Sequence, residues 1–305
     1  MAISFRQCEI FCKVAELEHV TKASEQLLLS QSAVSMAIAE LEKFAGAPLF
    51  ERRGRRLLLN DRGRQVLPEV REVLAKMAGI EQFLNESTAE PVGELKVGAS
   101  TTIGNYLLPL IVGEFSRHYP RASALLQVGN TLQIELAVES GECDLGLIEG
   151  PAHLSTLTVT PWKRDELVVI AGQGHPLAES KTIAEAALEE TRWIMREKGS
   201  GTREIFEAAM QRLGAGYTIA MELGHTEAIK KAVEAGLGVG CLSRMAVQRE
   251  LDHGWLVEIS SPLELTRTLT ILTRESAFRT RLLTAYLALL EQSGDVKRAD
   301  PGAGI

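Results

Sequence analysis

Four arginines surround one glycine in the stretch FERRGRRLLLN, in a chain whose formal net charge is −7. Over residues 1–90 the charges balance, with 12 basic and 13 acidic side chains. Residues 43–64, however, hold only two acidic side chains against seven basic ones, which are Lys43, Arg52, Arg53, Arg55, Arg56, Arg62 and Arg64. A positive field confined to one segment indicates a docking surface, and it argues against a protein that coats nucleic acid along its whole length.

The residues before these arginines predict short helices. Apolar side chains from Phe5 to Ala15 recur every three or four positions, so we expect an amphipathic first helix with Ser4 as its N-cap. Thr21 is expected to cap a second short helix that turns Ala23, Leu27 and Leu28 inward.

A third helix is expected after a tight break at residues 29–31, with Ser32 at its start and Gly46 and Pro48 at its end. Its inward positions are Val34, Ile38, Leu41 and Phe44, and its outward positions are Ser32, Ser35, Met36, Ala39, Glu40 and Lys43. Two short helices joined by a break, the second with a polar outer face, predict a helix-turn-helix. Such a helix fits the DNA major groove, so we expect Gln31, Ser32, Ser35 and Met36 to reach base edges and phosphates.

The arginine cluster itself predicts a β-hairpin that turns at Gly54. On its own, a run of arginines is most often a solvated loop. Directly after a helix-turn-helix, the same hairpin predicts a wing whose arginines lie over the DNA backbone or minor groove.

A long helix is expected from about residue 61 to residue 84. Its apolar positions are spaced 4, 3, 4, 3 and 4 residues apart, at Val66, Val70, Val73, Met77, Ile80 and Leu84. This spacing is typical of a coiled-coil seam and indicates dimerisation, although packing onto a later domain of the same chain remains an alternative. Pro68 is expected to kink the helix or to mark a boundary in its first turns. The polar stretch 85–96, with Pro91 and Gly93, predicts a domain boundary.

From Leu95 onward, short apolar strands alternate with segments of helical length, which predicts an α/β fold with mainly parallel strands. The strands are LKVGAS, ALLQVGN, CDLGLIEG, ELVVIAG, RWIMRE, YTIAMEL and GVGCL. The helices are expected at residues 104–118, 132–140, 203–213, 227–235 and 276–292.

Polar side chains gather where these strands give way to helices. They are Ser100, Thr101 and Thr102, then Asn130 and Thr131, then Ser200, Thr202 and Arg203, and finally His225 and Thr226. Each one alone is an ordinary helix cap. Several together at strand-to-helix junctions predict a cradle for a small anion, because ligands of open α/β folds bind at the carboxyl ends of strands.

The sequence lacks the motifs of other function classes. No apolar run is long enough to span a bilayer, charged residues interrupt any signal-peptide core, and we therefore expect a cytoplasmic protein without membrane contact. No nucleophile, zinc or nucleotide motif is present, so no catalytic residue, metal or cofactor is predicted. Cys8 and Cys12 are read as buried thiols, with a redox sensor as the alternative.

The chain resembles the LysR-type transcriptional regulators. Residues 19–64, HVTKASEQLLLSQSAVSMAIAELEKFAGAPLFERRGRRLLLNDRGR, are similar to the family's DNA-binding signature, with Met36 where members usually carry arginine. The resemblance implies DNA contacts by Thr21, Gln31, Ser32, Ser35, Met36, Arg52, Arg53 and Arg55. It also implies a winged helix-turn-helix domain at 1–60, a linker and dimerisation helix at 61–90, and an effector domain at 91–305.

The effector half resembles the branch that regulates carbon-fixation and sulfur-metabolism operons, in segments such as LIEGP and GSGTRE. This resemblance implies two lobes like those of periplasmic binding proteins, at about 91–162 with 268–292 and at about 163–267. The chain would cross between the lobes near 161–165 and return near Arg267, and Glu149 would join the residues of the effector cleft. It further implies a homotetramer that binds promoter DNA and alters access for RNA polymerase.

A second hypothesis is a ligand-binding or enzymatic α/β protein whose N-terminal helices serve only for oligomerisation. The polar outer face of the third helix and the arginine-rich wing argue against it, because an oligomerisation module needs neither.

Overall fold

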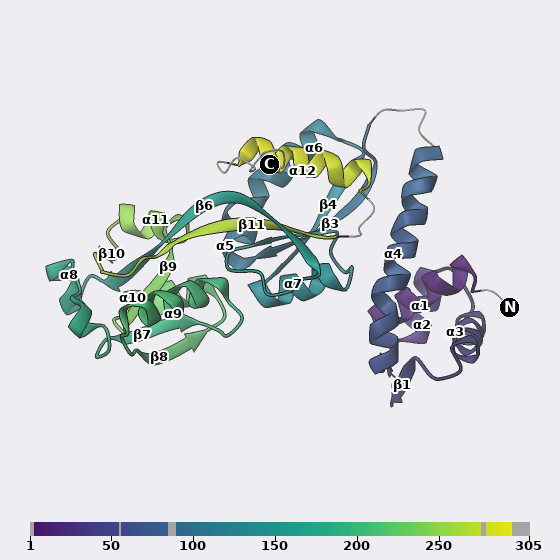
Figure 1. The fold of residues 1–305 in the computed structure, drawn as a ribbon, viewed down its shortest axis with the longest axis horizontal. Helices are drawn as coiled ribbons and strands as arrows, with labels where there is room; N and C mark the ends of the chain where they lie inside the picture. The colour runs from purple at the N-terminus through teal and green to yellow at the C-terminus, as the bar shows by residue number, and fades with distance from the viewer. Residues whose placement is uncertain (1–2, 55, 85–89, 276–278, 295–305) are drawn as a thin grey trace, which may run out of the picture. The chain divides into compact units, whose positions relative to one another are not determined.

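The computed structural model describes residues 3–54, 56–84, 90–275 and 279–294. The chain divides into two compact units (Figure 1). The first holds the N-terminal helices and the wing, and the second runs from β3 to α12. Each unit has its own hydrophobic core.

The N-terminal unit begins with three helices, α1 (Phe5–Leu17), α2 (Val20–Gln26) and α3 (Gln31–Ala45). Ser4 caps α1 as expected, and it exchanges hydrogen bonds with Gln7 in a capping box. Two predicted starts are wrong by one or two residues. His19 is the N-cap of α2, so Thr21 lies inside that helix, and Ser30 rather than Ser32 is the cap of α3, where its hydroxyl accepts from Ala33 N.

The core of this unit confirms most of the predicted inward positions. Phe11, Val34, Ile38 and Leu41 are buried, and Gly46 ends α3 with a φ of 70°. Two positions differ from the prediction. Leu28 is 92% exposed because the chain turns through it with a φ of 53°, and Phe44 is 57% exposed although the helical spacing places it inward.

The wing is a two-stranded antiparallel hairpin of β1 (Phe50–Arg53) and β2 (Arg56–Leu59), in which Arg53 pairs with Arg56. Gly54 has a φ of 63°, a conformation that glycine adopts at little cost and that closes this turn. Arg55 lies outside the described residues.

Helix α4 (Asp61–Leu84) follows the wing and continues through Pro68. Val66 and Val70 pack against the core of the N-terminal unit. Val73, Met77 and Ile80 are exposed. The predicted seam is therefore covered by the protein's own core only in its first half, and the side chain of Leu84 lies outside the described part of the chain.

The second unit is built on one mixed sheet with strand order β4-β3-β5-β11-β6-β9-β7-β8, and β10 pairs with β6. The strands are β3 (Gly93–Ser100), β4 (Ala122–Gly129), β5 (Leu145–Ile148), β6 (Leu157–Gly172), β7 (Arg192–Arg196), β8 (Thr218–Leu223), β9 (Val239–Ser243), β10 (Leu256–Ile259) and β11 (Thr266–Arg274). The strands around β3 and around β7 are parallel, as predicted. The pairs that involve β6 and β11 are antiparallel, which the strand–helix alternation did not predict.

Two lobes form because β6 and β11 run through both halves of this sheet (Figure 1). The first lobe carries α5 (Thr101–Tyr106), α6 (Leu108–His118), α7 (Thr131–Glu139) and α12 (Arg281–Ser293). The second carries α8 (Pro176–Ser180), the 3₁₀ turn η1 (Glu185–Ala187), α9 (Gly201–Leu213), α10 (Thr226–Glu234) and α11 (Arg244–Asp252). Each lobe buries apolar residues between its sheet and these helices.

The predicted helix at 104–118 is two helices in the structure. Helix α5 ends at Tyr106, and α6 begins at Leu108 with Pro109 in its first turn. A proline fits the first turn of a helix but breaks the hydrogen bonding of a helix interior, so the chain restarts here.

Candidate functional site

The outer face of α3 carries the predicted DNA-contacting residues Gln31, Ser32, Ser35 and Met36, and all four are exposed. The buried face of the same helix fixes them, because Val34, Ile38 and Leu41 anchor α3 in the core. Thr21 is half-buried and is the second residue of α2, the helix it was expected to cap.

The wing presents its arginines to solvent. Arg52, Arg53 and Arg56 are exposed. Arg53 pairs with Glu51 at 3.1 Å, and Arg56 lies 3.4 Å from Glu18, the C-cap of α1. Surface pairs of this kind are weak, so phosphate oxygens can replace the carboxylates as partners of these guanidinium groups.

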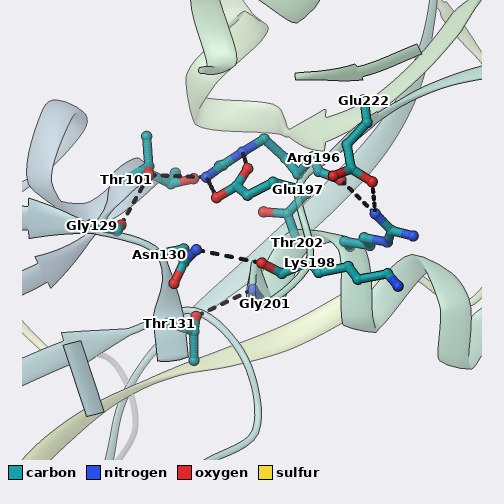
Figure 2. A network of polar contacts seen from close by, with 12 residues as sticks. Thr101, Gly129, Asn130, Thr131, Arg196, Glu197, Lys198, Gly201, Thr202 and Glu222 are labelled. Carbon is teal, nitrogen blue, oxygen red and sulfur yellow. Dashed lines mark hydrogen bonds and ion pairs between the residues drawn. The ribbon is translucent and has the colours of Figure 1, made fainter. Parts of the chain in front are cut away.

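The predicted effector residues lie where the two lobes meet, and several of them bond directly across the boundary (Figure 2). These bonds join Arg196 Nη2 to Thr101 Oγ1 at 3.1 Å, Gly201 N to Thr131 Oγ1 at 3.2 Å, Asn130 Nδ2 to the Lys198 carbonyl oxygen at 3.5 Å, and Thr202 Oγ1 to Glu149 Oε2 at 3.1 Å. A Cβ atom on Gly201 would lie 2.6 Å from Gly150 N, so the lobes touch at backbone distance here. Three of the four predicted strand-to-helix junctions, at 100–102, 130–131 and 200–203, therefore form one polar cluster.

Glu149 lies at the centre of a buried charge network. Its Oε2 accepts a hydrogen bond from Thr102 Oγ1 at 2.8 Å and lies 3.1 Å from Arg267 Nη1. Arg267 Nε also donates to Asp165 Oδ2 at 2.7 Å, and in the sheet Arg267 stands directly opposite Asp165. Burial by itself raises the pKa of Glu149, but the Arg267 guanidinium and the Thr102 hydrogen bonds outweigh it and hold that pKa below its ordinary value. The carboxylate is therefore charged at neutral pH.

Arg196 and Arg203 are both buried, but they have different partners. Arg196 forms a two-point contact with Glu197, with Nε and Nη2 at 2.7 and 2.8 Å from its oxygens, and it reaches Thr101 in the other lobe. Arg203 is held inside its own lobe, where it donates to Glu207 at 2.7 Å and to Glu222 at 2.6 Å. Of the two arginines, Arg196 is the one that joins the lobes.

In the described part of the chain, the side chains of the remaining predicted residues make no hydrogen bond across the lobe boundary. Ser100 and Ser200 are buried N-caps of α5 and α9 whose side chains make no capping hydrogen bond. His225 is exposed at the start of α10. Thr226 is buried, and its hydroxyl has no hydrogen-bond partner among the described residues.

Further contacts join the lobes outside the predicted set. His153 lies between two carboxylates, 3.3 Å from Glu135 of α7 and 3.3 Å from Glu204 of α9. Tyr106 of α5 donates to Glu227 of α10 at 3.2 Å. The two lobes are therefore joined at the polar cluster and also at His153 and at Tyr106.

Arg196, Arg267 and Asp165 are parts of the site that the sequence patterns did not predict. Arg196 ends the apolar strand RWIMR, and Arg267 interrupts the alternation of TRTLTIL at a position that faces inward. A charged side chain at an inward strand position is a usable signal, because a buried charge requires a partner.

Three of the four thiols, those of Cys8, Cys143 and Cys241, have a raised pKa. Burial raises the pKa of Cys8, raises that of Cys143 to about 11, and raises that of Cys241 to about 12. A thiol with a raised pKa is a poor nucleophile at neutral pH. Among the described residues, no cluster of three His, Cys, Asp or Glu side chains could hold a metal ion, and no helix is long and apolar enough to cross a bilayer.

Comparison with known proteins identifies both units. Residues 5–64 match the model of the bacterial regulatory helix-turn-helix proteins of the lysR family, and residues 88–295 match the LysR substrate binding domain. The chain belongs to the LysR family of transcriptional regulators. This LysR-family protein is thus a DNA-binding regulator with an effector-binding domain and not an enzyme, so the alternative of an α/β enzyme with oligomerisation helices is wrong.

The curated relatives of this LysR-family chain include regulators of the predicted branch. It is 42% identical to the uncharacterized regulator YeiE of Escherichia coli over 88% of this chain and 90% of that protein. It is 33% identical to the RuBisCO operon transcriptional regulator of Allochromatium vinosum, over 85% of each chain. It is 32% identical to CysL of Bacillus subtilis over 80% of this chain and 81% of CysL.

Solved LysR-family structures share its fold. A variant of full-length OxyR from Pseudomonas aeruginosa matches with a TM-score of 0.79 at 22% identity, over 96% of this chain and 95% of that one. The regulatory domain of CcmR from Synechocystis, solved in complex with 2-PG, matches with a TM-score of 0.62 at 30% identity, over 67% of this chain and 98% of that domain.

Proposed function

We propose that this regulator binds promoter DNA in a sequence-specific way and is controlled by a small anionic metabolite held between the two lobes. The observation that carries the effector half is the direct bonding of Thr101, Thr131 and Thr202 across the lobe boundary. Whatever binds among these side chains changes how the lobes meet. The CcmR domain that was solved with 2-PG supports a ligand of this class.

Arg196 is the group that we propose receives the anion. In the structure its Nη2 donates to Thr101 Oγ1 at 3.1 Å. An anionic oxygen is a stronger acceptor than a hydroxyl, so it can replace Thr101 as the partner of this guanidinium while the pair with Glu197 remains. The full effector-binding set comprises Arg196 with Ser100, Thr101, Thr102, Asn130, Thr131, Glu149, Ser200, Thr202, Arg203, His225 and Thr226.

Thr202 couples this site to the strands that connect the lobes. Its hydroxyl donates to Glu149 and accepts from Arg267 Nη1 at 3.0 Å. Arg267 lies in β11 and is paired with Asp165 in β6. We infer that a ligand that moves Thr202 is felt in β6 and β11 and so changes the angle between the lobes.

For DNA we propose that the α3 residues Gln31, Ser32, Ser35 and Met36 enter the major groove, with Thr21 at its edge. Arg52, Arg53 and Arg55 of the wing then contact the backbone. The exposure of the α3 face and of Arg52 and Arg53 supports this arrangement.

The assembly is proposed on the exposed half of the α4 seam, where Val73, Met77 and Ile80 have no cover from their own unit. We infer a dimer through α4 and a homotetramer in the cytoplasm that acts on RNA polymerase at the promoter. In this proposal residues 1–60 bind DNA, 61–90 dimerise and 91–305 sense the effector, with lobes at 91–162 plus 268–292 and at 163–267.

The DNA half is tested by fluorescence anisotropy with DNA from upstream of the protein's own gene and its divergent neighbour, against random DNA, at two salt concentrations. Tight and sequence-dependent binding is the expected result. Equal, weak binding to these sequences and also to duplexes selected by the protein from a random library would contradict a sequence-specific regulator.

The effector half is tested with Thr101→Ala and Thr202→Ala, using 2-PG, inorganic phosphate and sulfate as probes of the DNA-binding response. Both variants should lose response without losing DNA affinity, because each removes one cross-lobe bond. Thr266→Ala, at an exposed position of β11, is the matched control. A normal response in both cleft variants would place the effector elsewhere.

A further inference from the structure

The outer face of α3 lacks the side chains that read guanine. From Gln31 to Glu40 its exposed residues are Gln31, Ser32, Ser35, Met36, Ala39 and Glu40, and Lys43 appears only in the last turn. Guanine is read mainly by arginine or lysine, adenine by asparagine or glutamine, and the thymine methyl group by apolar side chains. The first two turns of α3 therefore offer one adenine reader, Gln31, and one apolar side chain, Met36.

Met36 is the one long apolar side chain among the exposed residues from Gln31 to Glu40. It is 65% exposed, and its neighbours one turn away are the small residues Ser32 and Ala39, with Ser35 beside it. Small neighbours let the helix backbone approach the floor of the groove closely. The long carboxylate of Glu40 is drawn aside, because Gln7 of α1 donates a hydrogen bond to it at 2.9 Å.

The charges around this face indicate what kind of partner binds to it. Arg52, Arg53 and Arg56 of the wing and Lys43 of α3 are exposed in the same unit, which complements a polyanion. An apolar tip on such a surface meets an apolar group of a nucleic acid, and the only such group in the major groove is the thymine C5-methyl.

We propose that Met36 is a specificity-determining residue that contacts a thymine methyl group in each half-site, next to an adenine read by Gln31. This inference rests on the proposed role of α3 in DNA binding. The proposal predicts that the protein prefers A·T base pairs under the first two turns of α3 and that this helix reads no guanine.

The test removes the thymine methyl group in one experiment and the Met36 side chain in another. The full-length protein first selects duplexes from a randomised library, and each thymine of the selected half-site is then replaced by deoxyuridine, which differs only by that methyl. One such replacement should weaken wild-type binding about fourfold, the effect of burying one methyl-sized group. Met36→Ala should bind the two duplexes equally and with the weaker affinity.

Phe44→Ala is the control, since it truncates another exposed apolar side chain of α3, in the last turn. It should keep the fourfold discrimination. Met36→Arg provides a second arm, because an arginine at this place should select guanine at the position where the wild type selects thymine.

The outcomes separate this inference from the function beneath it. If the wild type selects a sequence but ignores every deoxyuridine, or if Met36→Ala keeps the discrimination, the role of Met36 is overturned while DNA binding stands. If the wild type selects no sequence at all, the proposed function fails together with this inference.

Discussion

The outer face of α3 and the boundary between the two lobes carry similar polar side chains, which are exposed in the first region and buried in the second. On α3, Gln31, Ser32 and Ser35 are exposed. Where the lobes meet, Thr102, Thr131 and Thr202 are each at most 2% exposed and are held by partners from elsewhere in the fold. Hydroxyl groups thus face solvent in one place and form a joint between the two lobes in the other.

The difference predicts how each region tolerates change. Exposed side chains on an anchored helix can be replaced with little effect on folding, because their partners are solvent. Side chains in the joint are satisfied by one another, so a replacement leaves a buried group without its partner. Variants of α3 should therefore alter binding alone, whereas variants of the joint should alter stability as well.

The largest expected effect is on the joint. Arg267→Met leaves Glu149 and Asp165 buried without their counter-charge, which should lower the free energy of unfolding by about 3–5 kcal/mol. Urea denaturation followed by tryptophan fluorescence measures this directly, since Trp162, Trp193 and Trp255 are the three tryptophans and all lie in the second unit.

Arg212→Met is the matched control for this variant. Arg212 and Glu264 lie 3.9 Å apart and are 57% and 81% exposed at their side chains, so its loss should cost less than about 0.5 kcal/mol. Similar losses in the two variants would mean that the buried network does not hold the lobes together.

Substitutions in the wing should change the affinity for DNA. The double variant Arg52→Ala/Arg53→Ala should weaken binding to all DNA sequences, because phosphates are shared by every sequence. If each arginine neutralises one phosphate, the slope of log K against log salt should become shallower by about two, at roughly 0.9 for each contact. Anisotropy titrations at several salt concentrations measure the slope.

Lys13→Ala/Lys76→Ala removes the same charge from α1 and α4 and serves as the control. An unchanged slope in the wing variant would remove the wing from the DNA interface.

The pH dependence of the free energy of unfolding tests the same joint, with a smaller expected effect than Arg267→Met. Because the pKa of Glu149 is held below its ordinary value of 4.5, this carboxylate contributes stability that is present above that value and is lost as the pH falls below it. Glu149→Gln should therefore show a shallower loss of stability between pH 5 and about pH 3 than the wild type. Urea midpoints across this range measure it, with Glu264→Gln as the exposed control, and parallel curves for wild type and Glu149→Gln would contradict the assignment.

The smallest effect is expected in the turn between α2 and α3. Leu28 has a φ of 53° and is almost fully exposed, so Leu28→Gly relieves an unfavourable backbone conformation without removing buried apolar surface. It should stabilise α2 and α3 by about 0.5–1 kcal/mol. Amide hydrogen exchange of residues 20–45 in the full chain reports on these helices alone.

Gly46→Ala is the converse variant. Gly46 has a φ of 70° and open space around it, so the added methyl should cost about 1 kcal/mol through the backbone alone. Opposite signs for the two variants are expected, and a loss for Leu28→Gly would mean that the exposed leucine makes a contact that the turn needs.

Local patterns in the sequence determined much of this protein. The Ser4 cap, the buried face of α3, the glycine turn of the wing and the strand-to-helix junctions could all be predicted, because each depends on residues within a few positions of one another. The grouping of the hydroxyl groups at the lobe boundary could also be predicted, because the carboxyl ends of parallel strands meet at one edge of a sheet.

The tertiary structure alone decided the rest. The exposure of Leu28 and Phe44 depends on how the helices pack, and the half-covered seam of α4 depends on where the core of the N-terminal unit ends. The charge network at the joint depends on Arg267 meeting Asp165, which is 102 residues away, and Glu149 across a sheet whose central strands are antiparallel. Short-range spacing fixes the face of a helix or strand, but the partner of a buried charge is chosen by the fold, because only the fold brings distant segments within hydrogen-bonding distance.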